Sequence, residues 1–335
     1  MATNEVVLSV QNLSVEFSTD DGVLKAVDNL SYDLTAGETL GIVGESGSGK
    51  SVSSMAILGL LPKSAKISGD VLFRGQSILG LPESELRSFR GNKIAMVFQD
   101  ALASLNPVMT IGKQITEAIQ VHDDKITAVQ ARERVVELLD IVGIPEPGRR
   151  VDQFPHEFSG GMRQRAMIAM SIANEPDVLI ADEPTTALDV TIQAQVMEVF
   201  ERIQERTSSS LLLITHDLGV IAGVADRVMV MYAGRQVELG SVDDVFYRTG
   251  HPYAQGLLAS LPRVDGNTPG NRLHRIKGQP PSLVFLPPGC AFNPRCPYAK
   301  SGTCDVVRPE MHSVGFAHAS ACHFAEELMT KEVAL

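Results

Sequence analysis

The chain has 335 residues, of which 44% are hydrophobic and 21% charged, so it can bury a real core and is not disordered as a whole. Its length exceeds the usual domain size of roughly 100–200 residues, which predicts two domains or one large α/β domain with an appendage. The formal net charge of −11 argues against broad, charge-driven binding to nucleic acids.

The N-terminal residues indicate a strand and not a targeting segment. Residues 1–17 contain no basic stretch followed by an apolar one, so we expect no signal peptide. The longest apolar stretches, such as Met55–Leu61 and Leu211–Ile214, are much shorter than the ~20 residues of a membrane helix. We therefore expect the protein to act at a membrane only from its surface, through partners.

The first hundred residues predict mostly strands. Alternation of apolar and polar residues over 6–18 and 23–40, with turn residues between, indicates a β-rich beginning. A short buried strand, Thr39–Val43, leads into a glycine-rich loop, and a helix is expected from Lys50 to Leu61, before Pro62. Further strands around a short helix are expected over 67–98, the last of them Ile94–Phe98.

The pattern changes twice in the rest of the chain. Over about 110–175 apolar residues recur at spacings of three and four, which predicts helices. The next elements are a strand, a helix, a strand and a hairpin, with the strands at Val178–Ala181, Leu211–Thr215, Arg227–Tyr232 and Arg235–Glu238. After about 250 proline and glycine become dense and all four cysteines occur, so we expect two domains, 1–250 and 251–335.

The glycine-rich loop carries the clearest chemical signal. Residues 44–51 match the phosphate-binding pattern G-x-x-x-x-G-K-[ST] in full and lie between an expected strand and an expected helix. Glycines let backbone N–H groups surround a phosphate at the positive end of the helix dipole. We expect Lys50 to reach the β- and γ-phosphates and the Ser51 hydroxyl to bind Mg²⁺. The expected nucleotide contacts are Gly44, Glu45, Ser46, Gly47, Ser48, Gly49, Lys50, Ser51 and Val52.

A second strand ends in two carboxylates, Asp182 and Glu183. A P-loop nucleotidase needs a carboxylate for Mg²⁺ and a group that orients the attacking water. We assign the first role to Asp182 and the second to Glu183. A strand that ends in Asp-Glu is weak evidence alone, but together with the P-loop it indicates nucleotide hydrolysis.

Further short motifs occur in an order that resembles the ATP-binding subunits of ABC transporters, over roughly residues 6–245. The motifs are Val97–Asp100, Phe158–Met162, Thr186–Asp189, Ile214–Asp217 and the aromatic residue Phe17. The resemblance implies an α/β P-loop core with an antiparallel β subdomain and an α-helical insertion at about 100–175. It also implies that Phe17 stacks on adenine, that Gln99 contacts Mg²⁺, that Asp189 lies in the D-loop and that His216 acts catalytically at the γ-phosphate.

Ser159, Gly160 and Gly161 begin a helix expected to run from Met162 to about Ala173, so they offer a hydroxyl and backbone N–H groups to an anion. They resemble the centre of the ABC signature, with Phe158 and Met162 in place of the commonest Leu and Gln. The resemblance implies that two ATPases dimerise head to tail and that this signature acts in trans, on the γ-phosphate of the partner subunit.

Longer stretches resemble one branch of the family, the ATPases of bacterial oligopeptide and dipeptide importers. They include Gly41–Ser54, Phe154–Met170 and Ile180–Gln195. The branch also imports nickel chelates and glutathione, so those cargoes stay open as alternatives. A non-transport ABC ATPase is disfavoured, because the chain has neither paired ABC domains nor a long coiled-coil insertion.

The resemblance also implies partners and a location. The partners are two transmembrane permease subunits, a second ABC ATPase subunit and an extracytoplasmic peptide-binding protein, with no nucleic acid. We expect the second ATPase to be a different chain, and a second copy of this chain stays open as the alternative. The implied location is the cytoplasmic face of the inner membrane, as a peripheral subunit.

The four cysteines follow the spacing Cys290-x5-Cys296-x7-Cys304-x17-Cys322. In a reducing compartment, four thiols in a Pro/Gly-rich segment suggest a bound metal and not disulfides. The C-x2–4-C pairs typical of zinc are absent, whereas a [4Fe–4S] cluster tolerates varied loops. The importer branch carries a similar tail. We expect a [4Fe–4S] cluster, with Zn²⁺ or reduced thiols without metal as the alternatives.

Overall fold

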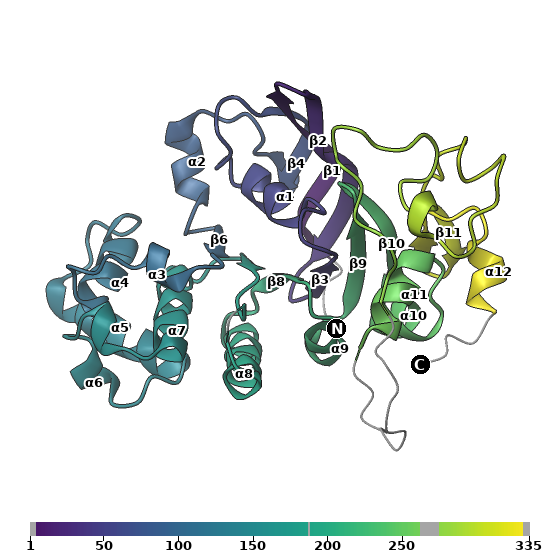
Figure 1. Cartoon of the computed structure of the whole chain (residues 1–335). Coiled ribbons are helices and arrows are strands. Elements are labelled where there is room, and N and C mark those ends of the chain that lie inside the picture. The colour runs from purple at the N-terminus through teal and green to yellow at the C-terminus, as the bar shows by residue number, and fades with distance from the viewer. Residues whose placement is uncertain (1–4, 187, 262–274, 331–335) are drawn as a thin grey trace, which may run out of the picture. The chain divides into compact units, whose positions relative to one another are not determined.

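The computed structural model describes residues 5–186, 188–261 and 275–330 (Figure 1). Its backbone contacts divide the chain into two compact units that alternate along the sequence. Unit 1 comprises residues 1–9, 33–39 and 72–214, and unit 2 comprises residues 10–32, 40–71 and 215–335.

The core of unit 1 is a set of parallel strands. In spatial order they are β8 (Ser210–Thr215), β7 (Val178–Asp182) and β6 (Ile94–Val97), with Val178 opposite both Ile94 and Ser210. Every residue of β7 is buried, as in parallel sheets that are covered on both faces, which explains its continuous apolar sequence. Because the strands are parallel and in register, their carboxyl ends meet at one edge.

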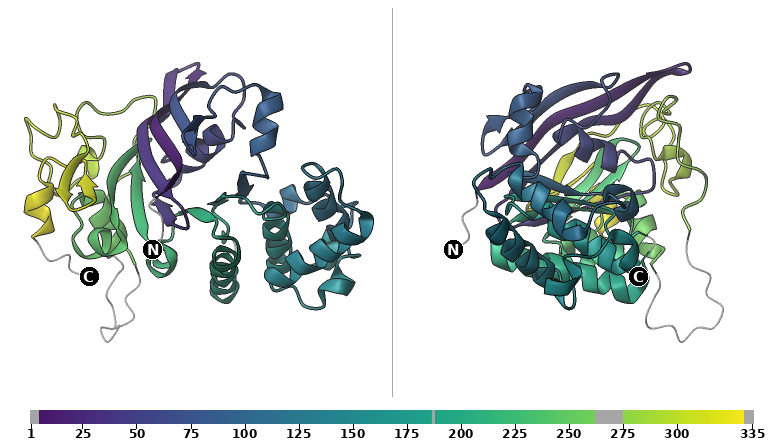
Figure 2. Two further views of the ribbon diagram at one scale, coloured as in Figure 1. Left: turned by 180° about the vertical axis from the view of Figure 1, so that it is seen from behind. Right: turned by 90° about the vertical axis from the view of Figure 1, so that its left-hand side faces the viewer.

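Several helices of unit 1 pack together beside these strands. Helices α4, α5 and α7 pack against one another, and α7 also contacts β6 and α8 (Figures 1 and 2). These helices confirm the predicted change of pattern over about 110–175. The helices are α2 (Glu83–Phe89), α3 (Ala101–Ser104), α4 (Ile111–Gln120), α5 (Ala128–Ile141), α6 (Pro147–Arg150), the 3₁₀ helix η1 (Pro155–Glu157), α7 (Gly160–Ser171) and α8 (Val190–Thr207).

Most residues of three further strands belong to unit 2. In spatial order these strands are β2 (Gly22–Thr35), β1 (Val6–Thr19) and β4 (Lys66–Phe73). The end of β4 pairs in unit 1 with β5 (Gln76–Ser77). These strands confirm the β-rich beginning that the alternating pattern predicted.

The second sheet segment of unit 2 joins the P-loop strand to the C-terminal region. Strand β3 (Thr39–Val43) is parallel to β9 (Arg227–Tyr232), which is antiparallel to β10 (Arg235–Ser241). Beyond β10 lie β12 (His318–Ser320) and β11 (His312–Gly315), both antiparallel to their neighbours. The remaining helices of unit 2 are α1 (Lys50–Ile57), α9 (Leu218–Val224), α10 (Val242–Tyr247), α11 (Pro252–Ala259), the 3₁₀ helix η2 (Asn293–Arg295) and α12 (Ala325–Met329).

The turn between β9 and β10 agrees with the sequence-based prediction, whereas the end of α1 does not. The hairpin between β9 and β10 turns at Ala233 and Gly234, both with positive φ, as a two-residue type I′ turn requires. The helix predicted from Lys50 to Leu61, however, ends at Ile57. The reason is Gly59, whose φ of 61° places it in the left-handed region that closes helices before any proline is needed. Within the described ranges no helix has the length and apolar character needed to span a bilayer.

Candidate nucleotide site and cysteine cavity

The P-loop of unit 2 connects β3 to α1, between a buried strand and a helix as the sequence predicted. Gly49 caps the helix with a φ of 100°, and a Cβ atom there would lie 2.2 Å from the carbonyl oxygen of Ala26. Only glycine fits this position, because a side chain would be strained and would collide with backbone. The loop therefore holds its backbone close to the preceding hairpin.

Lys50 lies inside the curve of this loop. Its side chain is buried, with 4% of the residue exposed, and its Nζ donates to the carbonyl oxygens of Gly44, at 2.7 Å, and Glu45, at 3.1 Å. A phosphate would compete with these carbonyls for the ammonium group, which is the role predicted for this lysine. Ser51 and Val52, in the first turn of α1, are half-buried.

Two residues of the C-terminal region contact the P-loop at Glu45. The hydroxyl oxygen of Tyr253 accepts a hydrogen bond of 2.7 Å from the Glu45 backbone N–H. The guanidinium of Arg295 binds both carboxylate oxygens of Glu45, at 2.7 and 2.9 Å, and this hydrogen bonding raises the pKa of Arg295. Sequence reasoning missed both contacts, since no local pattern connects residues so far apart in the chain.

In unit 1 the structure brings Gln99 and Glu183 together, as expected for two groups of one site. The Glu183 carboxylate accepts hydrogen bonds from Gln99 Nε2, at 3.1 Å, and from Thr186 Oγ1, at 2.8 Å. Glu183 has a φ of 47°, which is strained for a residue with a side chain and is typical of functional sites. Asp182, next to it at the end of β7, is 6% exposed. Thr186 was predicted only as part of the D-loop, not as a partner of Glu183.

The signature residues lie at the start of α7, also in unit 1. Ser159 is its N-cap, and its Oγ accepts from the Met162 backbone N–H at 3.3 Å. Ser159 and Gly160 are exposed, while Phe158 is buried and anchors the turn. The backbone N–H groups at an exposed helix N-terminus are suited to bind an anion outside this unit.

The other residues predicted from the resemblance are distributed between the units. Asp189 is the N-cap of α8 in unit 1 and accepts from the Ile192 N–H at 3.0 Å. Phe17 is half-buried on β1 and His216 is exposed after β8, both in unit 2 with the P-loop.

The four cysteines gather around one small cavity of about 20 Å³ in unit 2. Burial raises the pKa of Cys296 to about 11 and that of Cys322 to about 12, and it also raises the pKa of Cys290. The backbone N–H of Cys290 donates to the carbonyl oxygen of Cys304 at 2.8 Å, which joins two of the loops. In the described part of the chain no group of three or more His, Cys, Asp or Glu side chains is arranged to hold a metal ion, so this arrangement gives no support to the [4Fe–4S] cluster expected from the sequence.

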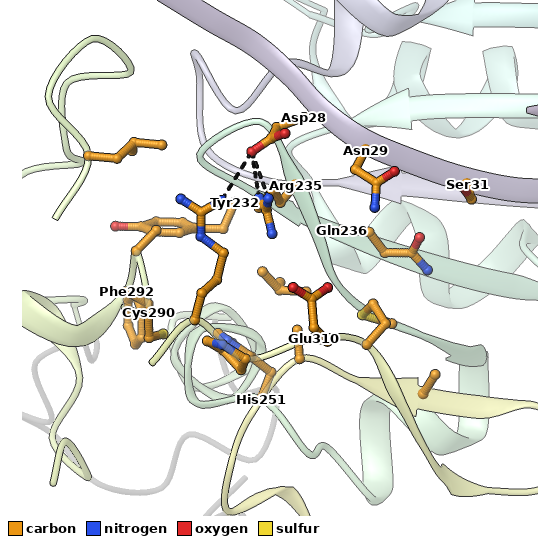
Figure 3. A pocket seen from close by; sticks show the side chains of 18 of the residues that line it. Asp28, Asn29, Ser31, Tyr232, Arg235, Gln236, His251, Cys290, Phe292 and Glu310 are labelled. Carbon is orange, nitrogen blue, oxygen red and sulfur yellow. Dashed lines mark hydrogen bonds and ion pairs between the residues drawn. The ribbon is translucent and has the colours of Figure 1, made fainter. Parts of the chain in front are cut away.

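A second cavity of about 380 Å³ is also lined by Phe292 and Cys290 (Figure 3). Both arginines in its wall bind one carboxylate, since Asp28 accepts from Arg235 at 2.7 Å and from Arg308 at 3.4 Å. Sequence reasoning did not predict this cavity.

A complete P-loop after a parallel strand, together with a second strand that ends in Asp182 and a restrained Glu183, defines a P-loop nucleotide hydrolase. Residues 27–186 match the ABC transporter family model, and residues 237–304 match the C-terminal region of oligopeptide/dipeptide transporters. The chain belongs to the ABC transporter family and is an ATPase of that class. The resemblance and the fold class expected from the sequence are thereby confirmed.

Individual relatives agree with this assignment. The chain is 52% identical to the dipeptide transport ATP-binding protein DppD of Bacillus subtilis, over 96% of both chains. It is 51% identical to the oligopeptide transport ATP-binding protein OppD of Salmonella typhimurium, over 88% of this chain and 87% of that one. A dimeric bacterial ABC transporter cassette is similar in structure, with 26% identity and a TM-score of 0.63 over 70% of this chain and 98% of that one.

Proposed function

We propose that this ATPase powers the import of dipeptides or oligopeptides through a channel formed by other subunits. The restrained Glu183 carboxylate supports hydrolysis, because it is held by two donors at the end of a strand whose last residue is Asp182. The cargo is supported by the similarity to dipeptide and oligopeptide transport ATP-binding proteins, which includes their C-terminal region.

Each site residue has a role in this proposal. Lys50 and the P-loop backbone hold the phosphates, and Glu183 orients the attacking water. Hydrolysis then depends mainly on positioning and on charge stabilisation. Ser51, Asp182 and Gln99 bind Mg²⁺, His216 contacts the γ-phosphate and Phe17 stacks on adenine. Ser159, Gly160 and Gly161 act on the nucleotide of the partner subunit, and Asp189, in the D-loop of this chain, contributes to nucleotide binding.

The proposed complex contains two permease subunits, a second ATPase of different sequence and an extracytoplasmic peptide-binding protein, with this chain bound peripherally at the membrane. The dimeric cassette to which the chain is similar supports a pair of ATPases. The net charge of −11 is consistent with partners other than nucleic acid.

Reconstitution of the complex in proteoliposomes tests this function. We expect peptide uptake that requires ATP and the binding protein, and that stops with Glu183→Gln in this chain. ATP turnover stimulated by a nickel chelate or glutathione, and not by peptides, would assign a different cargo. Recovery of the chain with ribosomes or nucleic acid, and without membrane proteins, would contradict the transport function.

We further propose that Cys290, Cys296, Cys304 and Cys322 hold a [4Fe–4S] cluster. The support is that the four thiols line one cavity. Burial raises the pKa of Cys296 and Cys322, so binding of the cluster would have to displace the protons of these thiols. A bound cluster would supply a cross-link between the surrounding loops and a one-electron redox centre.

Anaerobic purification followed by iron and acid-labile sulfide analysis tests the cofactor. We expect both elements, and their loss when Cys304 is replaced by serine. Zinc without sulfide would identify the site as a zinc site. Absence of iron, sulfide and zinc would show that the four cysteines are reduced thiols without a metal.

A further inference from the structure

The first side chain of the P-loop is held by a segment near the C-terminus. The guanidinium of Arg295 forms a two-pronged ion pair with the carboxylate of Glu45, at 2.7 and 2.9 Å. Only 5% of the Arg295 side chain is exposed. Such a planar, paired contact fixes the orientation of both groups and not only their distance.

Arg295 is itself fixed on several sides. Its Nε donates to the carbonyl oxygen of Lys277 at 3.1 Å, and its Nη1 lies 3.3 Å from the hydroxyl of Tyr232. The guanidinium also lies 5.8 Å from the centre of the Tyr232 ring and 5.9 Å from the centre of the Phe292 ring. The two aromatic side chains are labelled in Figure 3. These contacts hold the charged group in one position.

The turn that carries Arg295 is anchored between cysteines. The Asn293 N–H donates to the carbonyl oxygen of Cys290 at 3.0 Å, and the Cys296 N–H donates to that of Asn293 at 3.2 Å. The side chain of Arg295 therefore projects from a short, bonded turn of the cysteine segment to the P-loop.

Glu45 transmits this restraint to the phosphate-binding groups. Its N–H donates to the buried hydroxyl of Tyr253, while its carbonyl oxygen accepts from Lys50 Nζ at 3.1 Å and from the Ser48 N–H at 3.2 Å. One residue thus links the C-terminal region to the phosphate-binding lysine. A loop that is already ordered loses less conformational entropy when it binds its ligand.

We propose that Arg295 is a positioning residue for ATP, which acts by fixing Glu45 and with it the first turn of the P-loop. The inference rests on the proposed role of the P-loop in ATP binding. It assigns to the C-terminal region a part in nucleotide affinity, separate from any group that the cysteines hold.

Binding of a fluorescent methylanthraniloyl ATP to the full chain, together with steady-state ATP hydrolysis in the complex, tests this role. Arg295→Met should raise the Kd and the KM for ATP by about tenfold, since it removes two charge-assisted hydrogen bonds, and change kcat by less than about twofold. Arg295→Lys should restore part of the affinity, because an ammonium group keeps the charge without the paired geometry. Arg308→Met is the matched control: it removes an arginine of the same region that pairs with Asp28, and should leave both constants unchanged.

Glu45→Gln supplies an independent variant on the other side of the pair. It should raise the Kd to a similar extent, and the double variant should be no weaker than either single one, because both remove the same interaction. If Arg295→Met does not fold, Arg295→Lys and Glu45→Gln decide the question through the same constants. Unchanged affinity in these variants, additive effects, or a loss of kcat alone would overturn the inference. A wild-type chain that binds no ATP would instead contradict the proposed function.

Discussion

Gln99 donates a hydrogen bond of 3.1 Å to the carboxylate of Glu183, although the two residues lie 84 positions apart in the chain. The contact follows from the sheet, since Gln99 comes just after β6 and Glu183 just after β7, and these strands are paired in parallel. Thr186 donates to the same oxygen at 2.8 Å. The proposed catalytic carboxylate is therefore oriented by two donors.

Replacement of Glu183 by glutamine should lower kcat for ATP by about 10²–10⁴-fold, because the amide cannot accept a proton from the attacking water. ATP binding should persist, since the P-loop is unchanged. Glu201→Gln, an exposed site on α8, is the matched control and should leave kcat unchanged. Turnover by the assembled complex and binding by the full chain are the measurements. Equal turnover in both variants would exclude Glu183 as the water-orienting group.

Loss of the Thr186 hydroxyl should also slow hydrolysis. Thr186→Val keeps the shape of the side chain but removes one donor to Glu183, and a hydrogen bond to a charged group corresponds to a decrease in kcat of about tenfold. Thr186→Ser retains the hydroxyl and should keep most of the activity. The comparison of the two variants in steady-state ATPase assays isolates the hydrogen bond, and similar kcat values would show that it has no catalytic role.

Replacement of the signature serine, Ser159, should lower both the stability of the fold and the rate of ATP turnover, for two separate reasons. Ser159→Ala removes the N-cap of α7, and Thr127→Ala removes that of α5, so each should lower the free energy of unfolding by about 1 kcal/mol. Only Ser159→Ala should reduce ATP turnover by the complex, because only Ser159 is proposed to act on the nucleotide of a partner. Urea unfolding and ATPase assays measure the two effects. A parallel loss of turnover in both variants would reduce the role of Ser159 to helix capping.

The buried His251 should make the fold sensitive to acid. Burial lowers the pKa of His251 to about 3 in the folded chain, against an ordinary value of 6.5. Below pH 6.5 the unfolded chain therefore takes up a proton that the folded chain does not, and stability falls by up to ~1.4 kcal/mol per pH unit as the pH decreases towards 3.

His251→Asn should remove this dependence, because asparagine can still accept the hydrogen bond of 3.1 Å from the Tyr253 N–H but does not titrate. Glu238 has the opposite sign: burial raises its pKa, so it stabilises the fold as the pH falls. Its bonds from the backbone N–H groups of Gly250 and His251 remain in the variant, so the comparison with wild type cancels its contribution. Urea unfolding between pH 7 and 4 measures the difference, and parallel curves would contradict the assignment to His251.

The sequence alone could predict those parts of the site that consist of consecutive residues. The P-loop, the strand that ends in Asp182 and Glu183, and the Ser-Gly-Gly turn at a helix start each combine local backbone geometry with the groups that use it. Strand alternation and helix spacing likewise predicted the order of the elements. The end of α1 was wrong by several residues, because Gly59 closes the helix before Pro62 is reached.

The tertiary structure decided which distant side chains complete these motifs. Thr186 and Gln99 restrain Glu183 because parallel strands bring their carboxyl ends together. Tyr253 and Arg295 restrain Glu45 because the C-terminal region packs on the P-loop within unit 2. An ion pair between residues 250 positions apart has no periodicity and no fixed spacing, so it arises only when the chain has folded and the two charged groups have been brought together.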